Sequence, residues 1–248
     1  MMPLVAVAHG SRDPRSSRAV AAALDTVRAE NPGLDVRLAF LDLNTPSVGQ
    51  VLDALAADGH RQVAVVPLLL GSAFHARVDL PALLREARQR HPRLEVLCSP
   101  ILGDDGLLVD AARDLITATG VSVDDPSVGV AVCAVGSRRP DANRATEPVV
   151  PRILAGTAWT RASACFATSA EPSVGSALGS LSRSGARTLV LAPWILAPGL
   201  LWDRACSVAE SVPNVRIATT LTDHSAVAGV IAARYSDTVR RAHLPRVA

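Results

Sequence analysis

Lysine is absent from this chain of 248 residues, and aromatic residues make up only 3% of it. All 25 basic residues are therefore arginines, a bias that genomic composition explains and that supplies many bidentate carboxylate binders. The formal net charge of +2 is too balanced to indicate a nucleic-acid-binding surface. Because hydrophobic residues still make up 49%, we expect a core of Ala, Val and Leu, which suits helices packed on a parallel sheet.

The cysteines and the apolar segments exclude further classes of protein. Four scattered cysteines form no C-x-x-C pair, so neither a zinc site nor an iron–sulfur cluster is indicated, and a reduced cytoplasmic protein is expected. The apolar start, Met1 to Ala8, lacks a basic region and is too short for a signal peptide. No apolar run approaches the roughly 20 residues of a membrane-spanning helix. The glycine-rich nucleotide motifs and the G-x-S-x-G motif are also missing, so no organic cofactor is expected.

The two halves of the chain repeat each other. Val7–Arg12 reads VAHGSR and Cys133–Arg138 reads CAVGSR, and the offset between matched residues is 126. An offset that persists without a gap over long stretches indicates an internal duplication. The same offset relates three further pairs: Pro46 and Pro172, Gly59 and Gly185, and Pro67 and Pro193.

The two copies differ in their histidines. His9 is matched by Val135, and His75 is matched by Leu201. Two imidazoles are thus present in the first copy and absent from the second at the same positions. We therefore expect the first copy to carry the chemistry and the second to be a degenerate repeat.

Short apolar runs alternate with longer amphipathic ones, which is typical of a parallel sheet with helices on its faces. The expected fold class is α/β, with two tandem domains, 1–122 and 123–248, each built on a parallel sheet of about four strands. The linker is expected within Gly120–Ser127, and a helix over Gly106–Thr117 closes the first domain. The other expected helices are Ser16–Glu30, Pro46–Asp58, Val78–Arg90, Asp141–Leu154, Pro172–Ser184, Trp202–Glu210 and Ser225–Arg240. The expected strands are Leu4–Ala8, Val36–Leu41, Val63–Leu70, Leu94–Cys98, Val128–Ala134, Thr160–Phe166, Thr188–Pro193 and Val215–Thr219.

Polar side chains follow three strands of the first half. His9 ends the first strand, Asp42 follows the second, and His75 lies beyond the third. Ligands of open parallel sheets bind beyond the carboxyl ends of the strands, so these groups are expected at one edge. Two imidazoles and a carboxylate suit a divalent metal such as Fe²⁺, Co²⁺, Ni²⁺ or Zn²⁺, and each group can take a proton near neutral pH. The alternative is that each histidine packs or caps locally and that Asp42 closes a turn.

Three segments together resemble a known family. They read A-H-G-S-R within Val7–Arg12, F-L-(acid)-x-x-x-P-S over Phe40–Ser47, and P-L-L-L-x-x-x-x-H-x-x-x-D over Pro67–Asp79. In this order and spacing they resemble the CbiX/SirB-type sirohydrochlorin chelatases, members of the class II chelatase family. The likeness covers about the first 120 residues, and the second half resembles the degenerate repeat of two-domain members.

The resemblance implies two flavodoxin-like, chelatase-like domains that form a cleft, and insertion of Fe²⁺, Co²⁺ or Ni²⁺ into sirohydrochlorin with release of two protons. It implies that His9 and His75 bind the metal and accept protons. Asp42 falls where the family more often has Glu, so its catalytic role is a separate hypothesis. Because the tetrapyrrole carries several carboxylates, arginines and polar groups near the histidines are expected to bind it. These substrate-binding candidates are Ser11, Arg12, Arg77 and Arg138.

Several alternatives stay open at this point. A non-catalytic carrier of the metal or of the tetrapyrrole would use the same two histidines. A histidine phosphatase needs Arg before the histidine, and here that residue is Ala8. Trp194 and Trp202 either stack on the macrocycle or pack in the core. The sequence does not choose the metal, nor whether the product is sirohaem or a cobalamin precursor. Since one chain holds both repeats, a monomer is expected. The remaining histidines, His60, His91, His224 and His243, are expected to be solvated.

Overall fold

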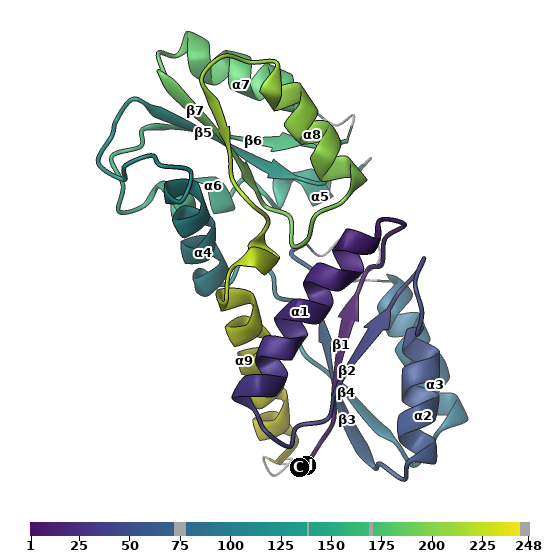
Figure 1. Ribbon diagram of the computed structural model, residues 1–248. Helices are drawn as coiled ribbons and strands as arrows, with labels where there is room; N and C mark the ends of the chain where they lie inside the picture. Colours follow the sequence, from purple (N-terminus) through teal and green to yellow (C-terminus); the bar gives the residue numbers. More distant parts are fainter. Residues whose placement is uncertain (72–77, 138, 169–170, 244–248) are drawn as a thin grey trace. The chain divides into compact units, whose positions relative to one another are not determined.

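The computed structural model describes residues 1–71, 78–137, 139–168 and 171–243. The chain forms two compact units, drawn as a ribbon in Figure 1. Unit 1 contains Met1–Gly103 and the chain from Ser225 onward, and unit 2 contains Asp104–His224. Each unit holds one four-stranded sheet, and every strand pair in both sheets is parallel.

The sheet of unit 1 has the order β2-β1-β3-β4, with β1 (Leu4–Ala8) and β3 (Gln62–Pro67) in the middle. Every residue of β1 is buried, as expected for a strand covered on both faces. Helices α1 and α9 pack together on one face of the sheet, and α2 and α3 pack together on the other (Figure 1). The remaining elements are β2 (Val36–Phe40), β4 (Glu95–Cys98), α1 (Pro14–Glu30), α2 (Val48–Ala57), α3 (Leu80–Arg90) and α9 (Ala226–His243).

The sheet of unit 2 repeats this order as β6-β5-β7-β8. Helices α7 and α8 pack together beside the sheet, α6 packs against β6 and α4, and α4 packs against β7. The elements are β5 (Val128–Ala134), β6 (Arg161–Phe166), β7 (Thr188–Pro193), β8 (Val215–Ile217), α4 (Gly106–Thr117), α5 (Pro140–Arg144), α6 (Val149–Leu154), α7 (Val174–Arg183), α8 (Leu200–Glu210) and the short 3₁₀ helix η2 (Leu221–Asp223).

The division into units differs from the expected domains 1–122 and 123–248. Helix α4, expected to close the first domain, belongs to unit 2, and α9 from the end of the chain belongs to unit 1. The two sequence halves have therefore exchanged their last helices. Each of these helices buries an apolar stripe, and either sheet offers an apolar face to receive it. The periodicity of a helix gives its buried side but does not identify the sheet that covers it.

The helix expected over Asp141–Leu154 is two short helices, α5 and α6. Pro148 stands at the junction, where it lacks the backbone N–H that a continuous helix requires. The chain between the two helices forms turns, and α6 then packs against β6. The break makes the first crossover of unit 2 less regular than the long helix α1 of unit 1.

Asp13 fixes the start of α1, directly after the end of β1. Its side chain is only 5% exposed and accepts hydrogen bonds from the backbone N–H and the side chain of Arg15. These bonds hold the pKa of the Asp13 carboxyl below its usual value, because they favour the charged form. Asp13 therefore anchors the loop that follows β1 to the first turn of the helix.

We predict that Asp13→Ala lowers the melting temperature at pH 7, because it removes this cap and its ionic bond. A lowered folded-state pKa contributes stability above the unfolded value of about 3.9, and this stability is lost as the pH falls through the folded value. The difference in melting temperature between Asp13→Ala and wild type should thus become smaller below about pH 4 in calorimetric scans. An equal difference at pH 7 and at pH 3 would contradict this role of the carboxylate.

Candidate active site

The carboxyl ends of β1, β2 and β3 form one edge of the unit 1 sheet. The backbone N–H of Asp42 donates to the carbonyl of His9 at 3.0 Å, and the N–H of Leu68 donates to the carbonyl of Val7 at 2.8 Å. In the sheet, β2 pairs with one side of β1 and β3 pairs with the other side. The direction in which successive strands are added therefore reverses at β1. Such a reversal opens a crevice where ligands of doubly wound sheets bind. His9 is the first residue beyond β1 at this point.

His9 is half-buried, and its Nδ1 lies 3.2 Å from the carbonyl oxygen of Gly10. In the tautomer with the proton on Nδ1, this nitrogen donates to that oxygen and Nε2 keeps its lone pair. This is the usual arrangement of a metal-binding histidine, because the second hydrogen bond sets both the tautomer and the ring orientation. The local geometry therefore suits His9 to bind a divalent metal or to accept a proton.

Gly10 is the residue that lets the ends of β1 and β2 approach each other. Its φ is +96°, and a Cβ atom built on it would lie 1.9 Å from the carbonyl oxygen of Asp42. No side chain fits between the two backbones, and the conformation is one that L residues rarely adopt. The glycine of the A-H-G-S-R motif thus holds His9 beside the end of β2.

The next residue, Ser11, is held by its neighbours. Its backbone N–H donates to Oδ1 of Asn44 at 2.6 Å, and its hydroxyl oxygen accepts from the N–H of Asp13 at 3.1 Å. Sequence reasoning missed Asn44, although the Asn-Thr-Pro turn that contains it was a signal for a side-chain-supported loop. Both bonds give Ser11 a positioning role in addition to the predicted contact with substrate.

Asp42 lies at the predicted edge and is exposed. Its Oδ1 accepts from the N–H of Leu43 at 2.7 Å, and Leu43 adopts a positive φ of 64°. One carboxylate oxygen therefore supports a tight turn, which agrees with the alternative interpretation of this residue. The other oxygen has no such role in the turn.

Of the remaining predicted site residues, the structure describes Arg12. Arg12 is exposed on the loop that carries His9. His75, Arg77 and Arg138 lie outside the described residues. Within the described part of the chain, no group of three or more His, Cys, Asp or Glu side chains is arranged to hold a metal ion.

The other histidines have structural contacts away from this edge. His91 Nε2 lies 2.7 Å from Asp53, His224 Nε2 lies 3.4 Å from Asp114, and all three residues His60, His91 and His224 are half-buried. These three histidines therefore lie beside aspartates and are partly buried rather than fully solvated. His243, at the end of α9, is exposed.

Unit 2 repeats the backbone of this edge without its histidines. The N–H of Thr168 donates to the carbonyl of Val135 at 3.0 Å, and that of Trp194 donates to Cys133 at 2.7 Å. Both bonds match those of unit 1 at the offset of 126 residues. Gly136 again has a positive φ, +85°, and a Cβ on it would lie 2.4 Å from Thr168 Oγ1. The duplication therefore extends to the loops that hold the strand ends together.

The two tryptophans of unit 2 pack in the core. Trp194 is 5% exposed and Trp202 is 7% exposed, and Trp202 belongs to the apolar cluster between the sheet and α8. This observation favours the packing alternative over stacking on a ligand, because little ring surface is accessible.

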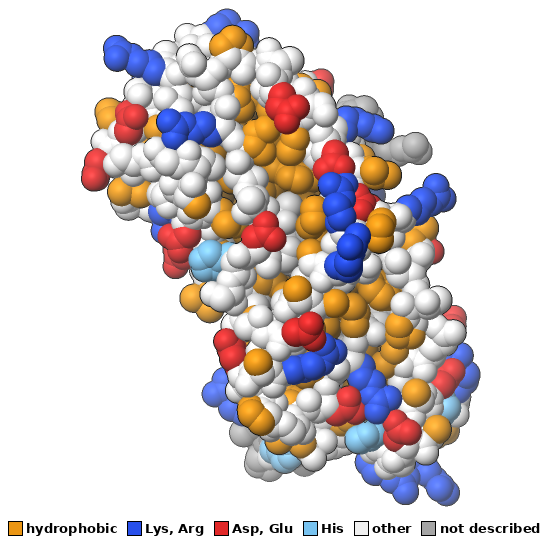
Figure 2. Space-filling view, viewed as in Figure 1, with side chains coloured by type: hydrophobic (Ala, Val, Ile, Leu, Met, Phe, Trp, Pro, Cys, Tyr) orange, Lys and Arg blue, Asp and Glu red, His pale blue; other side chains and the backbone are white. Residues whose placement is uncertain are grey.

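The surface carries charges of both signs. On the face drawn in Figure 2, red and blue side chains are interspersed among white and orange surface. This distribution agrees with the balanced net charge of the chain. Among the residues that the structure describes, no helix combines the length and apolarity needed to cross a membrane.

Comparisons with known proteins agree with the fold and with the duplication. The CbiX family model matches twice, over residues 3–119 and 129–238. The sirohydrochlorin ferrochelatase of Priestia megaterium is 28% identical over 200 residues, which are 79% of this chain and 74% of that protein. The sirohydrochlorin cobaltochelatase of the same organism is 24% identical over 207 residues, 82% of this chain and 67% of that protein. The structure of SirB from Bacillus subtilis with Fe³⁺ superposes with a TM-score of 0.83 at 24% identity, covering 98% of this chain and 97% of that one.

Proposed function

Because the chain belongs to the CbiX family, we propose that it is a sirohydrochlorin chelatase, which inserts Fe²⁺ or Co²⁺ into sirohydrochlorin and releases two protons. The observation that carries the proposal is the position of His9. It stands beyond β1, where the sheet order reverses, with an imidazole nitrogen suited to a metal. The matching position of unit 2 holds Val135, which can neither bind a metal nor take a proton.

The reaction exchanges two pyrrole protons for one divalent cation. The metal is a substrate, and His9 and His75 are proposed to bind it on its way to the macrocycle. Two imidazoles leave coordination positions of the metal open. The pyrrole nitrogens can therefore bind at these positions and then replace the imidazoles one after another. The nitrogens must lose their protons as the metal enters, and neutral imidazole or the Asp42 carboxylate can accept them. The imidazole that releases the metal is thereby free to take a proton.

Sirohydrochlorin carries several carboxylates, and Ser11, Arg12, Arg77 and Arg138 are proposed to bind them. Arg12 is the best placed of the described residues, because it is exposed on the same loop as His9. A guanidinium binds a carboxylate through two parallel hydrogen bonds. Arg12 therefore contributes to binding rather than to proton transfer.

We predict that Arg12→Ala raises KM about ten-fold with little change in kcat, since a hydrogen bond to a charged group contributes about 1.5 kcal/mol. Steady-state kinetics with sirohydrochlorin as the varied substrate measure this effect. Arg61→Ala is the matched control, because Arg61 is exposed before β3 at the opposite edge of the sheet. An unchanged KM for Arg12→Ala would remove Arg12 from the binding site.

The proposed activity is tested by mixing protein, sirohydrochlorin and Fe²⁺ or Co²⁺ without oxygen and following the absorption of the macrocycle. The protein should accelerate the change over the protein-free rate. Equal rates with and without protein would refute the enzyme and leave a non-catalytic carrier of metal or tetrapyrrole as the remaining function.

The physiological metal and product are further parts of the proposal. Relatives named as ferrochelatase and as cobaltochelatase match this chain about equally well. Imidazole and carboxylate groups accept Fe²⁺, Co²⁺ and Ni²⁺, and metal availability then decides among them. We propose that the chain acts in the cytoplasm as a monomer, in sirohaem or cobalamin biosynthesis. Anaerobic competition between Fe²⁺ and Co²⁺ distinguishes these two products.

A further inference from the structure

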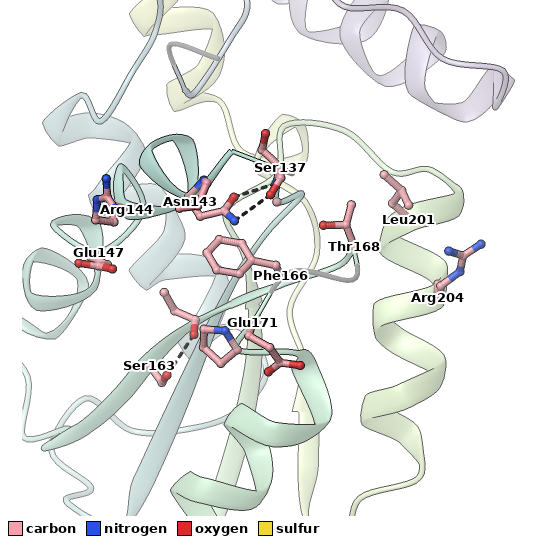
Figure 3. A pocket seen from close by; sticks show the side chains of 14 residues that line it. Ser137, Asn143, Arg144, Glu147, Ser163, Phe166, Thr168, Glu171, Leu201 and Arg204 are labelled. Atoms are coloured by element: carbon pink, nitrogen blue, oxygen red, sulfur yellow. Dashed lines mark hydrogen bonds between the residues drawn. The ribbon is translucent and has the colours of Figure 1, made fainter. Parts of the chain in front are cut away.

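Unit 2 contains a large pocket at the edge of its sheet that corresponds to the His9 edge of unit 1. Its volume is about 1040 Å³. The lining comes from the loop after β5, the end of β6 and the start of α8, as Figure 3 shows. Pockets for small ligands usually measure about 300–1,000 Å³, so this one is large enough for a macrocycle.

The pocket keeps a rigid rim although the histidines are lost. The N–H of Ser137 donates to Oδ1 of Asn143 at 2.7 Å, and Nδ2 of Asn143 donates back to the carbonyl of Ser137 at 2.9 Å (Figure 3). In unit 1 the equivalent Ser11 is held by Asn44, which comes from a different loop. The two copies therefore stabilise the same loop by unrelated side chains. Such a replacement indicates that the shape of this edge has a use in unit 2 also.

Apolar side chains stand at this edge of unit 2 where unit 1 has its histidines. Leu201 lines the pocket and is 36% exposed, and Val135, in the place of His9, is 42% exposed. Phe166 lies at the centre of the view in Figure 3, between the loop after β5 and the start of α8. Phe166 is only 4% exposed, so Leu201 is the side chain among these that offers van der Waals contact to a flat apolar ligand, and neither of the two can bind a metal.

Two arginines stand on opposite sides of the pocket in Figure 3. Arg144 ends α5 and Arg204 lies on the first turns of α8, with Phe166 between them in Figure 3. Both are exposed, and within the described part of the chain neither forms an ion pair. By contrast, the ion pairs of Arg15, Arg37 and Arg152 hold other loops in place. Arg144 and Arg204 are thus available to an anionic ligand.

Two glutamates also line the pocket, and they limit its positive charge. The Glu171 carboxylate accepts from the N–H of Ser173 at 2.8 Å and from the hydroxyl of Ser176 at 3.2 Å, so it is engaged at the start of α7. Glu147 is exposed three residues after Arg144. Its negative charge repels an anionic ligand near Arg144. Removing this charge is therefore expected to strengthen binding of the ligand, whereas removing either arginine is expected to weaken it.

We propose that this pocket is a binding site for the tetrapyrrole, in which Leu201 contacts the ring and Arg144 and Arg204 bind carboxylates at its opposite sides. The inference rests on the proposed function, because that function identifies the ligand as a carboxylated macrocycle. It assigns a substrate-binding site to the degenerate repeat and distinguishes it from the metal-binding residues. Arg144 and Arg204 are binding residues in this account and take no part in proton transfer.

The test is a titration of the protein with metal-free sirohydrochlorin, in which binding is measured by the fluorescence of the macrocycle. Arg144→Ala and Arg204→Ala should each weaken binding roughly ten-fold, and the double variant should weaken it more. Glu147→Gln should strengthen binding. Arg183→Ala is the matched control, because Arg183 is an exposed arginine at the end of α7, near the opposite edge. The fully esterified macrocycle should bind wild type and the arginine variants equally, since it offers no carboxylate.

The outcomes separate this inference from the proposed function, because the titration contains no metal. Weaker binding by both arginine variants supports the pocket even if the wild type fails to accelerate metal insertion. Unchanged affinity in the double variant, with a melting temperature like that of wild type, overturns the pocket even if insertion is accelerated. A loss of affinity for the esterified macrocycle in the same variants would also overturn it, because the effect would not come from charge.

Discussion

Replacing His9 by alanine is expected to lower the rate of metal insertion roughly 100- to 10,000-fold, the usual contribution of a residue that transfers protons in the transition state. The fold should persist, because His9 is half-buried in a loop beyond β1 and contributes little to the core. The measurements are the anaerobic insertion rate and the melting temperature of the same preparation. Val135→Ala is the matched control, since Val135 occupies the equivalent position of unit 2.

His75→Ala should give the same loss if the two imidazoles act on one metal. Because the two residues would act as a unit, the double variant should be little worse than either single one. Wild-type rates in His9→Ala would remove the imidazole from the mechanism. A loss of equal size in Val135→Ala would show that the substitution acts through the loop rather than through the chemistry.

Replacing Gly10 by alanine is expected to lower the rate of metal insertion strongly and to destabilise unit 1. The left-handed conformation costs an L residue about 1–2 kcal/mol, and the new Cβ would lie 1.9 Å from the carbonyl of Asp42. This overlap can be relieved only if the ends of β1 and β2 move apart. His9 precedes Gly10 and would be displaced with the loop, so the rate should fall as far as in His9→Ala.

Gly59→Ala separates the effect of the strained backbone conformation from the effect of the overlap between the strand ends. Gly59 has a similar φ of +85°, but its Cβ would meet nothing within 4 Å. The control should therefore lose stability through the backbone alone and keep its activity. If Gly10→Ala behaved like Gly59→Ala in both the melting temperature and the insertion rate, the close approach of the two strand ends would have no part in the site.

Much of the fold was predictable because local signals and the duplication agree. The apolar runs predict the eight strands found in the described residues, and the constant offset predicts that the second sheet repeats the first, as the order β6-β5-β7-β8 confirms. The exchange of α4 and α9 was not predictable in this way. Amphipathic periodicity shows that a helix must cover an apolar face, but two similar sheets offer equivalent faces.

The site was predictable to a lesser extent. The strand pattern places His9 and Asp42 at one edge, and the bond from the Asp42 N–H to the His9 carbonyl confirms that their backbones meet. The supports of the loop were missed, because Asn44 lies 33 residues from the Ser11 amide that it binds. The sequence likewise contains Arg144 and Arg204 60 residues apart, and only the packing of α8 beside β7 brings both to one pocket.

The amount of product formed per protein molecule distinguishes a chelatase from a carrier of metal or tetrapyrrole. Sirohydrochlorin and Co²⁺ are supplied without oxygen in large excess over the wild-type protein, and the metallated macrocycle is measured by its absorption. Product is expected to accumulate well beyond one equivalent per protein, at a rate proportional to protein concentration. Product that stops at one equivalent, or that forms at the protein-free rate, would contradict the proposed chelatase activity.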